Sequence, residues 1–152
     1  MAGAGMVWFA VSTPATLMPS LLSLLILDPK FQRLRYCAAL ALFAAIVAMG
    51  SVPGVRAGIG DYASGLVLHS LAYGAITFLL FTGSSGSAAS RALRAVLTVA
   101  IMGAVDELVQ SLLPYRRGAV GDWLVDCNAA IVVAGLLWAF FRGQPRADEA
   151  RR

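Results

Sequence analysis

The chain has 152 residues, of which 59% are hydrophobic and 13% are charged. Charged residues make up about a quarter of an ordinary soluble domain, so this composition excludes a soluble enzyme and a disordered chain. Two cysteines, Cys37 and Cys127, are too few for a disulfide scaffold. The length allows one domain. We therefore predict an all-α integral membrane protein.

The net charge of +4 does not require a nucleic-acid partner. Cytoplasmic loops of membrane proteins are rich in Lys and Arg, and this bias alone makes such proteins basic. We expect no nucleic acid among the partners.

The N-terminal residues 1–27 carry no charged side chain, but Pro14 and Pro19 interrupt them. Proline in a helix interior removes a hydrogen bond and kinks the helix. We therefore predict an interfacial arm over these residues, with a fifth membrane span as the alternative. The arm and the basic stretch after it form an N-terminal region over 1–35.

Four later segments are apolar enough for membrane spans, each of which needs ~20 such residues. They are 36–53, 65–82, 91–113 and 119–141. Together they predict a four-helix transmembrane bundle over 36–141, followed by a polar cytoplasmic tail over 142–152. In the first span, Ala41 and Ala45 have a spacing suited to close helix packing in lipid.

The Lys and Arg residues predict the orientation. Nine of the twelve lie before the first span, at the start of the third, or after the fourth. The positive-inside rule assigns these segments to the cytoplasm. Both ends of the four-span unit then face the cytoplasm, and the loops 54–64 and 114–118 face outward.

Polar residues occur where the second span begins, the third ends and the fourth begins. They are His69, Tyr73, Asp106, Glu107, Gln110, Asp122 and Asp126. Charges inside hydrocarbon are costly and usually functional. In the predicted topology all these residues approach the outer face, so we predict one polar pocket open to the outer leaflet, with the loop containing Arg116 over it.

Glu107, Asp106 and His69 are the candidate catalytic residues, because carboxyl and imidazole groups in an apolar pocket suit general acid–base chemistry. Arg116 suits phosphate, since its planar guanidinium binds two oxygens at once. The other substrate-binding candidates are Gln110, Tyr73, Asp122 and Asp126.

Two other interpretations of these charges remain open. Asp106 and Glu107 could form a structural ion-pair network with Arg116 or Arg117. His69 beside carboxylates could be a metal ligand, but no HExxH or clustered-His spacing is present. We therefore expect no metal and no other cofactor. Trp123 is expected to be a membrane-interface anchor.

The run Asp106-Glu107-x-x-Gln110-x-x-x-Pro114-x-Arg116-x5-Asp122 resembles the signature of the VanZ-like family. The pair His69-x-x-x-Tyr73, after a first span that ends Ser51-Val52-Pro53, is similar to that family too. The resemblance extends over 36–141. In the family, an Asp-Lys pair precedes the His. This chain has Gly65-Leu66 at those positions, and Asp61 lies further upstream. The family's Asn four residues after the last Asp is Asp126, with Asn128 two residues later.

The resemblance implies a multi-pass protein of the bacterial cytoplasmic (inner) membrane and a link to low-level teicoplanin resistance, for which the family is named. From the convergence of charges we hypothesise that the pocket acts on or binds a phosphorylated membrane lipid or lipid-linked envelope precursor. Homo-oligomers are left open. The alternatives are a non-enzymatic surface protein and a small lipid or solute transporter.

Overall fold

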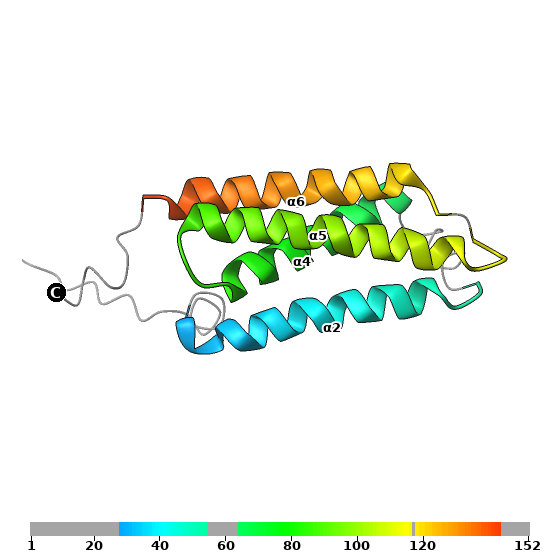
Figure 1. Cartoon of the computed structure of the whole chain (residues 1–152), viewed down its shortest axis with the longest axis horizontal. Helices are drawn as coiled ribbons and strands as arrows, with labels where there is room; N and C mark the ends of the chain where they lie inside the picture. Colours follow the sequence, from blue (N-terminus) through cyan, green and yellow to red (C-terminus); the bar gives the residue numbers. More distant parts are fainter. Residues whose placement is uncertain (1–27, 55–63, 117, 144–152) are drawn as a thin grey trace, which may run out of the picture.

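The computed structural model describes residues 28–54, 64–116 and 118–143. Within these ranges the chain forms α-helices, one short 3-10 helix and no strand. The elements are η1 (Pro29–Phe31), α2 (Gln32–Gly50), α4 (Gly65–Gly83), α5 (Ala88–Ser111) and α6 (Val120–Phe141). The α-helices lie along one another as a bundle (Figure 1). The predicted arm over 1–27 lies outside the described residues, as do 55–63 and 144–152.

The helices occur where the spans were predicted, with shifted ends. The largest shifts are at α2, which begins at Gln32 and ends at Gly50. Three segments, Pro29–Gly50, Gly65–Gly83 and Val120–Phe141, are long and apolar enough to cross a membrane. This indicates a membrane protein. The remaining predicted span, α5, is 24 residues long but is not among these three segments. It carries the charged residues Arg91, Arg94, Asp106 and Glu107.

Serine side chains cap the first turns of α4 and α5. Ser64 Oγ accepts a hydrogen bond from Val67 N at 3.4 Å, and Ser87 Oγ accepts one from Ser90 N at 3.2 Å. Such caps satisfy backbone N–H groups that have no partner inside the helix. They fix where each helix starts, and therefore which residues of α4 occupy its first two turns.

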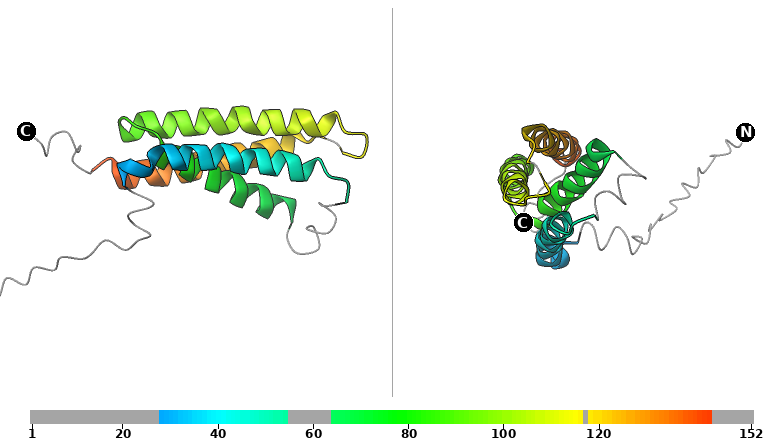
Figure 2. Two further views of the ribbon diagram at one scale, coloured as in Figure 1. Left: turned by 90° about the horizontal axis from the view of Figure 1, so that it is seen from below. Right: turned by 90° about the vertical axis from the view of Figure 1, so that its right-hand side faces the viewer.

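Helix α4 contacts each of the other three long helices, while α2 packs mainly on α4. Viewed along the bundle, α2 lies at its edge (Figure 2, right). Large side chains of α4, including Tyr73, Ile76 and Phe81, fill the core and are fully buried. Ala39 is the buried alanine of α2. Ala41 and Ala45 lie on the exposed face of α2, so they do not pack against another of the described helices of this chain.

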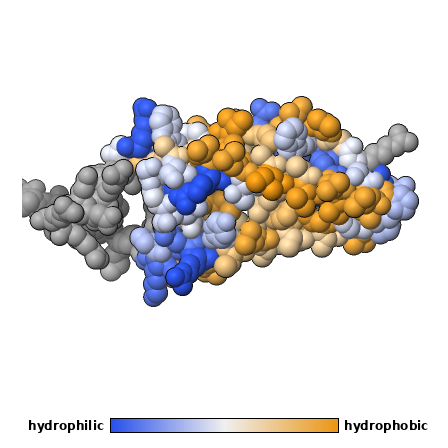
Figure 3. All heavy atoms as spheres, viewed as in Figure 1, coloured by the Kyte–Doolittle hydropathy of each residue, from blue (hydrophilic) through white to orange (hydrophobic). Residues whose placement is uncertain are grey.

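The outer surface of the bundle is apolar. Leu71 of α4, Ile101 of α5 and Leu136 of α6 are 69%, 66% and 67% exposed. On the face seen in Figure 3, hydrophobic residues extend along most of the bundle, and hydrophilic residues gather near the end where α2 begins and α6 ends. An apolar surface this extensive is unusual in soluble monomers, and it suits contact with lipid.

Two arginines donate hydrogen bonds to the last carbonyl groups of α4. Arg35 donates to Thr82 O from Nε at 3.1 Å and from Nη2 at 2.8 Å. Arg91 Nε donates to Phe81 O at 2.8 Å. The last carbonyls of a helix lack helical partners and carry partial negative charge. Arg35, which the sequence places in a basic juxtamembrane stretch, is thus 6% exposed and joins α2 to α4.

Next to this contact the backbones of α2 and α4 almost touch. A Cβ atom added to Gly83 would lie 2.7 Å from Tyr36 N and 3.0 Å from Gln32 O. Backbone atoms in a helix cannot rotate away, so the two helices would have to separate.

We therefore expect Gly83→Ala to lower the free energy of unfolding by about 1–3 kcal/mol, the usual cost of overpacking. Gly135→Ala is the matched control, because a Cβ at Gly135 meets nothing within 4 Å. Thermal unfolding of both variants in the same detergent, followed by circular dichroism, measures the difference. Equal transition temperatures for the two variants would contradict the close approach.

Candidate functional site

The predicted site residues come together at one end of the bundle. His69 lies in the second turn of α4, Asp106 and Glu107 lie near the end of α5, and Asp122 and Asp126 lie in the first two turns of α6. These ends of the three helices lie together, opposite the end where α2 begins (Figure 1). The convergence inferred from the spans is therefore present in the fold.

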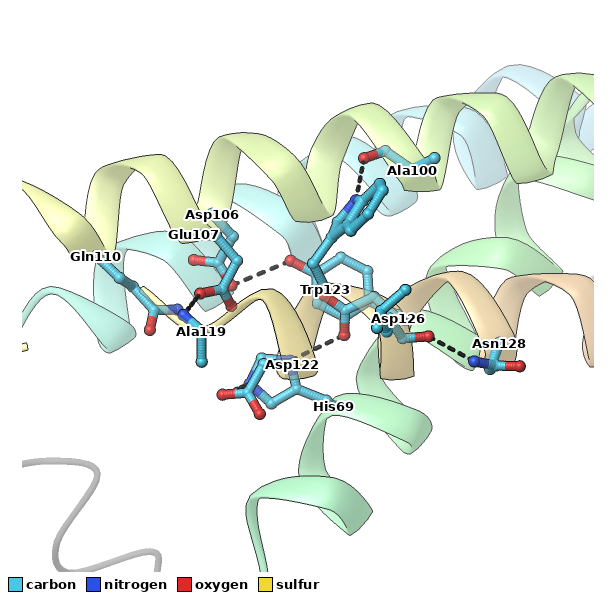
Figure 4. Close-up of polar contacts among 12 residues, drawn as sticks. His69, Ala100, Asp106, Glu107, Gln110, Ala119, Asp122, Trp123, Asp126 and Asn128 are labelled. Carbon is cyan, nitrogen blue, oxygen red and sulfur yellow. Dashed lines mark hydrogen bonds and ion pairs between the residues drawn. The ribbon is translucent and has the colours of Figure 1, made fainter. Parts of the chain in front are cut away.

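His69 is the centre of this cluster. Its Nδ1 lies 2.8 Å from Asp126 Oδ1, and its Nε2 lies 3.8 Å from Asp122 Oδ2. Asp126 is 0% exposed. Figure 4 shows His69 on α4 between these carboxylates of α6. Both ring nitrogens thus face acidic side chains, one of them fully buried.

Asp106 is held by Tyr73. The Tyr73 hydroxyl donates to Asp106 Oδ2 at 3.1 Å, and both residues are almost completely buried. The rings of Tyr73 and His69, four residues apart on α4, stack with their centroids 6.0 Å apart. Tyr73 therefore links the carboxylate of Asp106 on α5 to the imidazole of His69. The contact also fixes the axial position of α5 relative to α4.

Glu107 is held by the start of α6. Its Oε2 accepts a hydrogen bond from Ala119 N. The backbone is close as well, since a Cβ at Gly118 would lie 2.6 Å from Glu107 O. The other carboxylate oxygen, Oε1, is buried and has no hydrogen-bond partner among the described residues, and the same holds for Asp126 Oδ2.

Arg116 contacts Gln110 rather than a carboxylate. Its Nη2 donates to Gln110 Oε1, and Gln110 is 3% exposed. Between described residues, the ion pairs of the cluster run from His69 to Asp122 and Asp126. The alternative pairing of Asp106 or Glu107 with Arg116 is thus absent from this part of the chain, and Arg117 lies outside it.

A cavity of about 210 Å³ adjoins the cluster between α2 and the rest of the bundle. Its apolar walls include Ile46 and Met49 of α2 and Leu68 and Ala72 of α4. Its polar lining consists of His69, Tyr73, Asp106, Gln110 and Arg116. The cavity therefore combines an apolar wall with five of the eight predicted site residues.

Trp123, which the sequence predicts as a membrane-interface anchor, is half-buried, and its Nε1 donates to Ala100 O of α5 at 2.9 Å. A Cβ at Gly103 would lie 2.9 Å from Asp126 Oδ2 and 3.1 Å from Trp123 Cδ1. The absence of a side chain at Gly103 therefore makes room for both Asp126 and Trp123. The one sequence signal for this role is that Gly103 lies one helical turn before Asp106–Glu107.

Asn128 lies outside the cluster. It is exposed, and its Nδ2 donates to Leu124 O within α6 at 2.8 Å. The side chain that faces His69 is instead the acid Asp126.

We expect Tyr73→Phe to lower the free energy of unfolding by about 1–3 kcal/mol, because Asp106 would lose its buried donor. Tyr115→Phe is the matched control: it removes a hydrogen bond to Ser51 O from a tyrosine that is 48% exposed. Thermal unfolding in detergent compares the two variants. A shift for Tyr115→Phe as large as that for Tyr73→Phe would argue against a buried Tyr73–Asp106 contact.

Comparisons of the chain with protein-family models, with curated proteins and with solved structures find no match.

Proposed function

We propose that this chain is a VanZ-like multi-pass protein of the bacterial cytoplasmic membrane that binds, and acts on, a phosphorylated envelope lipid. One observation carries the proposal: a single cavity has an apolar wall on α2 and α4 and a polar end that contains an arginine. A lipid with a phosphate head group has the same division into an apolar and a charged part.

The apolar wall suits a hydrocarbon chain. Ile46, Met49 and Leu68 line the cavity, and α2, which supplies two of them, lies at the edge of the bundle. Ligand pockets are mostly apolar with a few convergent polar groups that fix orientation. A lipid chain in this cavity would lie along α2 and α4, with its head group toward the polar cluster.

Arg116 suits the phosphate. It is the basic side chain among the described residues that line the cavity. A guanidinium binds two phosphate oxygens at once, and the bond from Arg116 Nη2 to Gln110 Oε1 orients the group. In this proposal Gln110 positions Arg116, and Arg116 holds the phosphate.

The proton chemistry is assigned to Glu107 or Asp106 together with His69. Asp106 is buried and lines the cavity beside His69. The buried contact to Asp126 fixes the imidazole of His69. A carboxylate and an imidazole held close together in a desolvated site are the groups that general acid–base catalysis uses. Tyr73, Asp122 and Asp126 would position them.

The proposal includes α5 as a membrane span, with the chain entering and leaving the four-span unit on the cytoplasmic side. The charges of α5 support this, because Arg91 and Arg94 lie in its first two turns and Asp106 and Gln110 are buried in the bundle. The end of the bundle with Lys30, Arg33 and Arg142 is the more basic one. The positive-inside rule assigns such an end to the cytoplasm, and the cluster to the outer leaflet.

We expect Arg116→Gln to weaken binding of a polyprenyl phosphate about tenfold or more, since hydrogen bonds to charged groups contribute about 1.5–3 kcal/mol. Arg142→Gln is the matched control, because Arg142 lies at the other end of the bundle beside Trp138. Native mass spectrometry of the purified chain with the polyprenyl phosphate, and with the unphosphorylated polyprenol, measures both. Equal retention of phosphate and alcohol by the wild type would refute phosphate recognition.

We expect Glu107→Gln to abolish any protection from teicoplanin that the wild-type chain gives a bacterial host. Glutamine retains an oxygen that accepts from Ala119 N but removes the charge, so the fold should persist. Asp28→Asn, which preserves the cap at Lys30 N, is the control at the far end of the bundle. Susceptibility is measured at matched membrane levels. Loss of Glu107→Gln from the membrane would instead favour a structural ion-pair network.

A further inference from the structure

Among the described residues, the cluster contains more carboxylates than cations. Four carboxylates, on Asp106, Glu107, Asp122 and Asp126, surround one histidine, and the nearby Arg116 bonds to Gln110. Buried like charges are costly unless an opposite charge pairs with them. Among the described residues, Glu107 Oε1 and Asp126 Oδ2 are buried carboxylate oxygens without a partner, and Asp126 is 0% exposed. These oxygens indicate that a positively charged group belongs in the cluster.

The imidazole geometry shows where that charge would lie. A neutral imidazole donates from one ring nitrogen and has a lone pair on the other. With the proton on Nδ1 donated to Asp126 Oδ1 at 2.8 Å, the lone pair on Nε2 faces Asp122 Oδ2 at 3.8 Å. A lone pair facing a carboxylate oxygen is repulsive unless a proton or a metal ion lies between them. The position next to Nε2 is therefore the position for a cation.

Three possible ligand atoms lie close together in the cluster. One atom each from His69, Glu107 and Asp122 lie within 4.8 Å of one another, and Figure 4 shows these side chains gathered from α4, α5 and α6. Ligand atoms each ~2.1 Å from one ion are about 3.0–3.4 Å apart at octahedral or tetrahedral angles. The 3.8 Å between His69 Nε2 and Asp122 Oδ2, and the 4.8 Å that bounds the whole set, are wider than this. Binding an ion therefore requires Asp122, whose side chain is 27% exposed, and Glu107 to rotate inward.

We propose that His69, Glu107 and Asp122 bind a divalent first-row transition-metal ion, with Mn²⁺ or Zn²⁺ the best match. Imidazole favours the later metals of this series, and carboxylates favour Mn²⁺ and Mg²⁺. Asp126 is the outer partner that orients the imidazole, an arrangement that metal-binding histidines commonly have. Three protein ligands leave coordination positions open, which is typical of catalytic rather than structural sites.

The site deepens the proposed function but does not rest on it. A bound dication would offset the carboxylates next to the cavity and would give a phosphate oxygen a second positive partner beside Arg116. The ion would bind whether or not the cavity holds a lipid. The sequence leads us to expect no metal because the three ligands come from three helices and form no contiguous motif.

Titration with Mn²⁺ alone tests the proposal. The full chain is purified in detergent, treated with chelator and dialysed, and free Mn²⁺ is followed by its electron paramagnetic resonance signal. We expect one ion per chain, displaced by Zn²⁺. Asp122→Asn should weaken binding at least tenfold, and Asp126→Asn should weaken it about 10–100-fold, the usual effect of an outer partner. Asp28→Asn, the same substitution at the far end of the bundle, should leave binding unchanged.

The proposal is wrong if the wild-type protein binds Mn²⁺ and Zn²⁺ no more tightly than the Asp122→Asn variant does. The positive charge would then be an imidazolium at His69. Circular dichroism verifies that each variant is folded. If Asp122→Asn does not fold, His69→Gln takes its place as the variant that lacks one metal ligand. Because no lipid is present, failure here leaves the lipid proposal standing, and retention of lipid by chelator-treated protein tests that proposal separately.

Discussion

Asp126 has no exposed surface, and its Oδ1 lies 2.8 Å from Nδ1 of His69 across the bundle on α4. Removing one partner from such a buried pair costs about 3–5 kcal/mol, because a charge then remains in apolar surroundings without compensation. The pair therefore fixes the height of α6 against α4. Once that height is set, Tyr73 meets Asp106 one turn deeper, Trp123 meets Ala100 of α5, and Asp122 faces the outer nitrogen of the same imidazole.

Different contacts hold α2 at the two ends of the bundle. At one end, Arg35 and Arg91 bind the last carbonyls of α4, and Gly83 lets the backbone of α2 approach. At the other end, the cavity separates α2 from the polar cluster, and Tyr115 in the loop after α5 bonds to Ser51 just beyond α2. Helix α2 is thus held at both ends, and the cavity that would take the proposed lipid lies beside its last turns.

The acidity of the cluster constrains any mechanism. A phosphate brought beside Asp106, Glu107 and Asp122 would be repelled by all three, and the guanidinium of Arg116 alone offsets only part of that repulsion. A divalent cation held by His69, Glu107 and Asp122 would resolve this conflict, since it attracts carboxylate and phosphate alike. The two proposals therefore support each other physically while remaining separable by experiment.

The sequence by itself determined the helical class, the approximate extent of each helix and the end of the bundle where the polar residues gather. Hydropathy and i,i+4 spacing are local properties, and they are sufficient for these conclusions. The burial of Arg35, the contact of Trp123 with Ala100, the exposed position of Ala41 and Ala45, and the Arg116–Gln110 bond were decided only by the tertiary structure. Each depends on the rotation and height of one helix against another. Those quantities are set by the summed packing of residues far apart in the chain, such as Gly83 against Tyr36 and Gly103 against Asp126, and no local pattern specifies them.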